Sequence, residues 1–122
     1  MNIYIIMPVF NEEKFLNDSI DSIVKQILLP KKLLLINDSS TDNSENILKK
    51  YSNKFSWIEY INIESKQIHI PGEKVINAFN KGLDKLDSNY DIICKFDSDI
   101  ILPNNYLESV VKIFINNLKV GI

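Results

Sequence analysis

The chain has 122 residues, of which 45% are hydrophobic and 25% charged, and its formal net charge is −2. This is typical of one globular domain, and the nearly balanced charge excludes a general attraction to nucleic acid or to an anionic membrane surface. The single cysteine, Cys94, excludes an intrachain disulfide, and no apolar run approaches the roughly 20 residues that a membrane-spanning helix needs. We expect a cytoplasmic protein, or one attached peripherally to the inner membrane in its full-length form.

Strand and helix patterns alternate along the chain. Strands are expected over four short apolar runs, residues 3–9, 33–36, 57–63 and 91–96. Helices are expected where apolar residues recur at helical spacing, within residues 11–29, 41–54, 73–86 and 103–118. Asn11 is a candidate N-cap for the first helix, Ser40 or Thr41 for the second, and Pro103 suits the first turn of the last. This alternation predicts an α/β fold with a mainly parallel sheet.

Polar side chains follow three of the predicted strands. These clusters are Phe10 to Glu12, Asn37 to Ser40, and Asp97 to Asp99. Ligands of parallel α/β sheets bind beyond the carboxyl ends of the strands. If the three strands are neighbours, the clusters meet at one crevice.

Asp97 and Asp99 are the strongest candidates for chemistry. Two carboxylates at the end of a buried strand must find partners or lose water, and a cation between them relieves their repulsion. In an extended segment both would point to the same side, with Ser98 pointing away. Oxygen ligands suit Mn²⁺ or Mg²⁺ holding a diphosphate. In the alternative interpretation, Asp97 caps a turn and Asp99 is simply solvated.

Several other residues have both a functional and a structural interpretation. Asp38 can accept a hydrogen bond from a base imide or a ribose hydroxyl, or form an Asx-turn. Phe10 can stack on a nucleobase or belong to the core. Lys74, Asn80 and Lys81 lie around the third predicted helix, where a lysine near the start can reach a diphosphate or remain solvated at the surface.

Other catalytic arrangements find no support in the sequence. His69 is the only histidine and is expected in a surface loop, while Cys94 is expected to be a small buried apolar residue. Glu12 needs no role beyond a favourable charge at a helix N-terminus. There is no Ser-His-Asp set, zinc-ligand spacing or glycine-rich phosphate loop.

Four blocks in order resemble the N-terminal half of a family 2 glycosyltransferase with the GT-A fold. They are residues 7–12 (P-x-F-N-E), 36–42 (I-N-D-S-S-T-D), 72–82 (G…A-x-N-x-G) and 96–107 (D-x-D followed by P-x-x-L). The resemblance covers nearly the whole chain. It implies a Rossmann-like GT-A fold, with helices on both faces of the sheet, in which residues 1–122 form the nucleotide-sugar-binding part.

The resemblance also implies a donor site for a nucleotide-diphosphate sugar, with a UDP-sugar favoured, and Mn²⁺ or Mg²⁺ as cofactor. By position, Phe10 would lie against the base and Asp38 would bind the base or ribose. Asp97 would contact the ribose or sugar side and join Asp99, the main metal ligand. The remaining nucleotide-sugar contacts would come from Pro8, Val9, Glu12, Lys74 and Asn80.

The chain departs from the family pattern at three positions. Ser39 stands where glycine is common, which predicts a less tight turn, and Asn37 replaces a frequent aspartate. Phe79 stands where a basic residue often precedes the asparagine, so the diphosphate contact would fall to Lys74 or Lys81.

In this family the acceptor half follows the D-x-D block and carries the general base for inverting transfer to an acceptor hydroxyl. We therefore expect that base beyond Ile122, a glycan or lipid-linked acceptor, and a truncated fragment that is inactive alone and exposes an apolar face open to self-association. Two alternatives remain. A sugar-nucleotide nucleotidyltransferase would need a glycine-rich basic signature that residues 11–14 lack, and a non-catalytic nucleotide-sugar-binding or interaction module would never have had the catalytic half.

Overall fold

The computed structural model describes residues 1–65 and 72–119, in which strands and helices alternate as the sequence predicts. In chain order the elements are β1 (Ile3–Val9), α1 (Leu16–Val24), β2 (Lys32–Asp38), α2 (Ser44–Lys54), β3 (Ile58–Ile63), α3 (Glu73–Lys85), β4 (Ile92–Lys95) and α4 (Tyr106–Lys119). His69 and residues 120–122 lie outside the described residues. Within the described part, no helix is long and apolar enough to cross a membrane.

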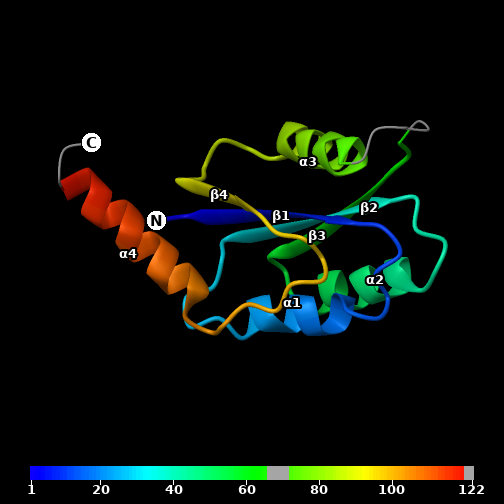
Figure 1. Ribbon diagram of the computed structural model, residues 1–122, viewed down its shortest axis with the longest axis horizontal. Helices are drawn as coiled ribbons and strands as arrows, with labels where there is room; N and C mark the ends of the chain where they lie inside the picture. Colours follow the sequence, from blue (N-terminus) through cyan, green and yellow to red (C-terminus); the bar gives the residue numbers. More distant parts are fainter. Residues whose placement is uncertain (66–71, 120–122) are drawn as a thin grey trace.

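The strands form one parallel sheet in the order β3-β2-β1-β4, with helices on both faces. Figure 1 shows α3 on one face, with α1 and α2 on the other. Side chains alternate between the faces of a strand. Ile5 and Met7 therefore join the core beneath α1 and α2, and Ile6 joins the core beneath α3. The predicted Rossmann-like α/β fold is confirmed.

Gly82 brings α3 unusually close to the sheet. A Cβ atom there would lie 3.0 Å from Cγ2 of Ile6 and 3.1 Å from Cδ1 of Ile36. Both isoleucines are fully buried. The missing side chain thus sets the depth at which α3 packs, and with it the position of every α3 residue that faces the carboxyl ends of the strands.

The predicted N-cap role of Asn11 is wrong, because α1 begins only at Leu16. Asn11 has a positive φ of 50°, and its Oδ1 accepts hydrogen bonds from the backbone N–H groups of Thr41 (2.7 Å) and Asp42 (3.3 Å). Its own N–H donates to Oγ of Ser40 at 3.1 Å. These polar groups therefore join two loops, and neither Ser40 nor Thr41 caps α2, whose N-cap is Asn43.

Hydrogen bonds connect the end of α1 and the residues just after it to the segment that follows β4. Gln26 is 5% exposed; its Nε2 donates to the carbonyl of Pro103 at 2.6 Å, and its Oε1 accepts from the N–H of Leu107 at 3.0 Å. Oγ of Ser22 accepts from the N–H of Leu102 at 3.0 Å. α4 begins at Tyr106, so Pro103 precedes the helix and the prediction that it lies in the first turn is wrong. The buried amide instead satisfies backbone groups at the entry to α4.

Some predicted apolar positions are not in the core. Ile27 lies beyond the end of α1 and is 64% exposed, Ile76 of α3 is 60% exposed, and Phe114 of α4 is 45% exposed. Cys94 is only half-buried, because β4 is at an edge of the sheet. Figure 1 shows α4 projecting beyond the sheet, which explains why only its first turns are well covered.

Candidate functional site

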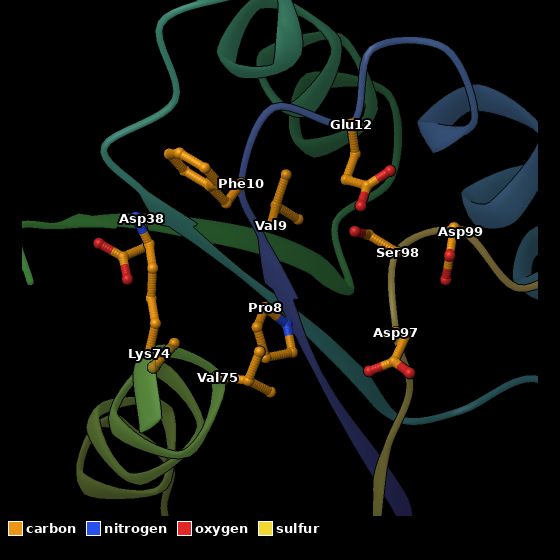
Figure 2. Close-up of a pocket in the computed structure, with 11 residues that line it drawn as sticks. Pro8, Val9, Phe10, Glu12, Asp38, Lys74, Val75, Asp97, Ser98 and Asp99 are labelled. Carbon is orange, nitrogen blue, oxygen red and sulfur yellow. The ribbon is translucent and has the colours of Figure 1, made fainter. Parts of the chain in front are cut away.

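A cavity of about 360 Å³ opens at the carboxyl ends of β1, β2 and β4, beside the start of α3. It is lined by residues from all three polar clusters and from α3: Pro8, Val9, Phe10, Glu12, Asp38, Lys74, Val75, Ala78, Asp97, Ser98 and Asp99. The clusters meet because β1 lies between β2 and β4. Asp38 and Asp99, which are 61 residues apart in the sequence, thus face the same space (Figure 2).

Phe10 and Lys74 form one side of the cavity. Phe10 directly follows β1 and is 47% exposed, so the alternative that it belongs to the core is wrong. Nζ of Lys74 lies 3.5 Å from the centroid of the Phe10 ring, a cation–π contact across the opening. Lys74 is the one cation among the described residues that line the cavity. An aromatic face and a positive charge are therefore adjacent.

Glu12 lies on the same side of the cavity as Ser98 and Asp99, away from Phe10 and Lys74 (Figure 2). Its backbone N–H donates to Oγ of Ser44 at 2.9 Å, which fixes the loop after β1 against α2. Burial, followed by the charges of Asp99, Asp42 and Asp97, raises the pKa of Glu12. Three nearby carboxylates contribute to that rise beside burial, so the electrostatic potential around Glu12 is negative. This side of the cavity is therefore suited to a cation.

Asp38 is 2% exposed and lies at the end of β2. Its Oδ1 accepts from the N–H of Ser65 at 3.1 Å and its Oδ2 accepts from the Ser65 hydroxyl. Nδ2 of Asn77, on α3, donates to that hydroxyl at 3.1 Å. The carboxylate is thus held by a distant segment and not by an Asx-turn. Ser39 adopts φ = 60°, the left-handed conformation that glycine adopts more readily.

The segment after β4 is a turn, not the extended segment in which Ser98 was expected to point away. β4 ends at Lys95, and the N–H of Ile100 donates to the carbonyl of Asp97 at 3.4 Å. Ser98 is consequently 5% exposed and lines the cavity. Asp97 and Asp99 remain exposed, and Nζ of Lys95 lies 3.3 Å from Oδ1 of Asp97. Since the sheet edge leaves both carboxylates in water, they need no partner to offset burial.

A metal ion is compatible with this site but would be incompletely coordinated by the protein. Nowhere in residues 1–65 or 72–119 do three or more His, Cys, Asp or Glu side chains gather to hold a metal ion. Asp97 and Asp99 supply carboxylate oxygens only, a donor set that suits Mg²⁺ or Mn²⁺ and not a thiolate-seeking ion. A cation there would take its remaining ligands from water or from the oxygens of a bound anion.

Two residues expected near the ligand point elsewhere. Asn80 is exposed and does not line the cavity. Helix periodicity explains this, because Val75, Ala78 and Gly82 share the inner face of α3, whereas Asn80 lies on the other side. Lys81 borders a separate hollow beside β3. Of the two lysines proposed to reach a diphosphate, only Lys74 faces the cavity.

Sequence reasoning missed Ser65 and Asn77. The signal that could have found Ser65 is its place after the carboxyl end of β3, the same kind of position as those of the three clusters that were found. Asn77 had no such signal, since it is one polar residue on an amphipathic helix. Asn37, the departure from the family aspartate, is buried, and its Nδ2 donates to Oδ1 of Asn62 at 2.8 Å, outside the cavity.

Parallel α/β domains bind their ligands beyond the carboxyl ends of the strands, and the acidic and aromatic cavity here places the chain in that class of ligand-binding domain. The family model for "Glycosyl transferase family 2" matches residues 4–122, and the chain belongs to that family. It is 33% identical over 110 residues to glycosyltransferase GlyA of Streptococcus pneumoniae, covering 90% of this chain and 14% of GlyA. It is 32% identical over 121 residues to the minor teichoic acid biosynthesis protein GgaA of Bacillus subtilis, covering 97% of this chain and 26% of GgaA.

Solved structures agree with the fold. TarS 1–349 of S. aureus superimposes with a TM-score of 0.73 at 25% identity, covering 96% of this chain and 33% of that one. The mannosyltransferase PcManGT from Pyrobaculum calidifontis, in complex with GDP-Man and Mn²⁺, gives a TM-score of 0.71 at 19% identity, covering 91% of this chain and 31% of that one. The chain therefore spans a third or less of the length of these relatives and structures.

Proposed function

We propose that this chain is the donor-binding part of a glycosyltransferase and binds a nucleotide-diphosphate sugar, with a UDP-sugar favoured. One observation carries the proposal: an aromatic ring, a buried carboxylate, a lysine and two exposed carboxylates face a single cavity. These are the groups that a base, a ribose, a diphosphate and a divalent cation each require. TarS has been crystallised with UDP-GlcNAc and with UDP, which supports the choice of nucleotide.

The groups follow one another across the cavity in an order that fits such a ligand. The exposed ring of Phe10 offers a face on which a base can stack. Asp38 carries lone pairs for a base imide or a ribose hydroxyl. The ammonium of Lys74, which lies over the Phe10 ring here, is within reach of the same space and would pair with the diphosphate.

Asp97 and Asp99 would hold Mn²⁺ or Mg²⁺ together with diphosphate oxygens. When bound, such an ion stabilises the negative charge of a departing nucleoside diphosphate. The carboxylates of Asp99, Asp42 and Asp97, which add to the effect of burial on the pKa of Glu12, favour a cation on this side. PcManGT, with the same fold, holds Mn²⁺ with its nucleotide sugar.

Sugar transfer needs an acceptor hydroxyl and a general base to deprotonate it. We infer that the base, and the site for a glycan or lipid-linked acceptor, belong to the part of the relatives' length that this chain does not span. The chain alone would then bind donor without transferring sugar, and transfer in the longer protein would invert the anomeric centre.

Thermal unfolding with UDP, GDP or dTDP, each with and without MnCl₂, tests the proposal. A ligand that binds only the native state adds about 2.7 kcal/mol of stability at a hundredfold excess over its Kd. Asp99→Asn should remove the Mn²⁺-dependent part of the UDP effect and leave the fold intact. Asp84→Asn, an exposed acid on α3 outside the cavity, is the matched control. If no nucleotide shifts the melting temperature with metal present, the donor-site proposal is wrong.

A further inference from the structure

We propose that Ser65 is a positioning residue for the nucleoside part of the donor, acting through Asp38, and that Asn77 orients Ser65 in turn. The inference rests on the proposed function, because it assigns Asp38 to the nucleoside. Ser65 lies outside the four blocks, Asn77 is within the block of residues 72–82 but is not one of its named positions, and neither residue lines the cavity.

The first support is the geometry of the contact. Ser65 donates twice to the same carboxylate, from its N–H to Oδ1 at 3.1 Å and from its hydroxyl to Oδ2. Two donors on two oxygens fix the plane of the carboxylate as well as its position. Donors to an ionised group also form stronger hydrogen bonds than neutral pairs do. Asp38 is 2% exposed, so little water is present to replace them.

The second support is the direction of the proton in the Ser65 hydroxyl. A hydroxyl has one proton to donate and two lone pairs. Nδ2 of Asn77 donates to Oγ of Ser65 at 3.1 Å and occupies one of those lone pairs. The single O–H is then free to point at Asp38. These hydrogen bonds thus connect Asn77 of α3, through Ser65 two residues beyond β3, to Asp38 at the end of β2.

The consequence for binding follows from what a carboxylate can do. With both oxygens held by Ser65, their remaining lone pairs keep a constant direction toward the cavity and accept an N–H or O–H of the ligand. Without the Ser65 hydroxyl, Oδ2 loses its donor. Oδ1 keeps the Ser65 N–H and the Ser39 hydroxyl at 3.5 Å, which hold one oxygen but no longer fix the plane of the carboxylate. Ligand affinity falls although no residue that touches the ligand has changed.

Isothermal titration of the 122-residue chain with UDP in the presence of MnCl₂ tests this inference. Ser65→Ala should weaken binding about tenfold, the size of one charge-assisted hydrogen bond. Ser65→Thr, which keeps the hydroxyl, should remain within about threefold of wild type, and Asn77→Ala should fall between the two. Ser52→Ala, a half-buried serine on α2 outside the cavity, is the matched control and should bind like wild type. Melting temperatures measured alongside show whether each variant is folded.

A double-mutant cycle separates positioning from a general structural effect. If Ser65 acts through Asp38, Ser65→Ala should change affinity less than about twofold in an Asp38→Ala background. An equal loss in both backgrounds, failure of Ser65→Thr to restore binding, or wild-type affinity of folded Ser65→Ala would each overturn the inference. If wild-type protein itself does not bind UDP, the proposed function fails first, and the two failures are thereby distinguished.

Discussion

Replacing Gly82 with alanine tests how tightly α3, which carries one wall of the cavity, is packed on the sheet. The new Cβ would meet Cγ2 of Ile6 at 3.0 Å and Cδ1 of Ile36 at 3.1 Å. Favourable contacts between carbon atoms lie at about 3.5–4.0 Å, so both approaches are too short by roughly half an ångström or more. Ile6 and Ile36 are fully buried and have little room to move.

Two effects of opposite sign decide the result. Alanine is favoured over glycine within a helix by about 0.8–1.0 kcal/mol. Forcing a methyl group into a well-packed core costs about 1–3 kcal/mol. Because two buried side chains are met at once, we expect the second effect to exceed the first, for a net loss of about 1 kcal/mol. That corresponds to a decrease in melting temperature of about 4 °C for a domain of this size.

Urea denaturation of Gly82→Ala, compared with Asn80→Ala, measures the difference. Asn80 is on the same helix but exposed and outside the cavity, so its replacement should gain a few tenths of a kcal/mol from helix propensity alone. The Asn80 variant should also bind UDP like wild type. An increase in the stability of Gly82→Ala by about 1 kcal/mol would refute the reasoning, because it would mean that the sheet yields freely to α3.

Three further predictions concern other residues. Phe10→Ala should weaken UDP binding by roughly 1–3 kcal/mol in a titration, and unchanged affinity would remove its stacking role. Lys74→Gln should weaken UDP binding and make the affinity less dependent on salt concentration; an unchanged salt dependence would contradict a diphosphate contact. Hydrogen bonds from Tyr4 and Lys32, among others, hold the pKa of Asp87 well below its usual range. Asp87→Asn should therefore lower the melting temperature at pH 7. The difference should shrink below about pH 4, because the carboxylate of the unfolded chain then takes up a proton that the native carboxylate resists; a constant difference would be inconsistent with this linkage.

The order of elements could be predicted from the sequence because each signal is local. Continuous apolar runs such as that in β1 indicate strands buried on both faces, and helical spacing of apolar residues indicates the helices between them. Polar residues directly after three such runs then locate the site, since parallel strands end at the same edge. For this reason the sequence alone predicts that Phe10, Asp38, Asp97 and Asp99 lie at one edge of the sheet.

Tertiary structure decided where polar side chains find their partners. Asn11 has the residue type and place of an N-cap, yet it bonds to the loop after β2, because that loop is adjacent only in the folded chain. Gln26 likewise donates a hydrogen bond to the carbonyl of Pro103, which is 77 residues away in the sequence. No local pattern distinguishes these uses from capping or solvation.

The sequence by itself determined the fold class, the edge of the sheet where the cavity lies and the acidic and aromatic character of that cavity. Only the folded structure showed that β4 is an edge strand whose end leaves Asp97 and Asp99 in water, that Asn80 points away and that Ser65 holds Asp38. The physical reason is range: backbone conformation and apolar periodicity are set by near neighbours, whereas burial and hydrogen-bond partners depend on strand order and helix rotation.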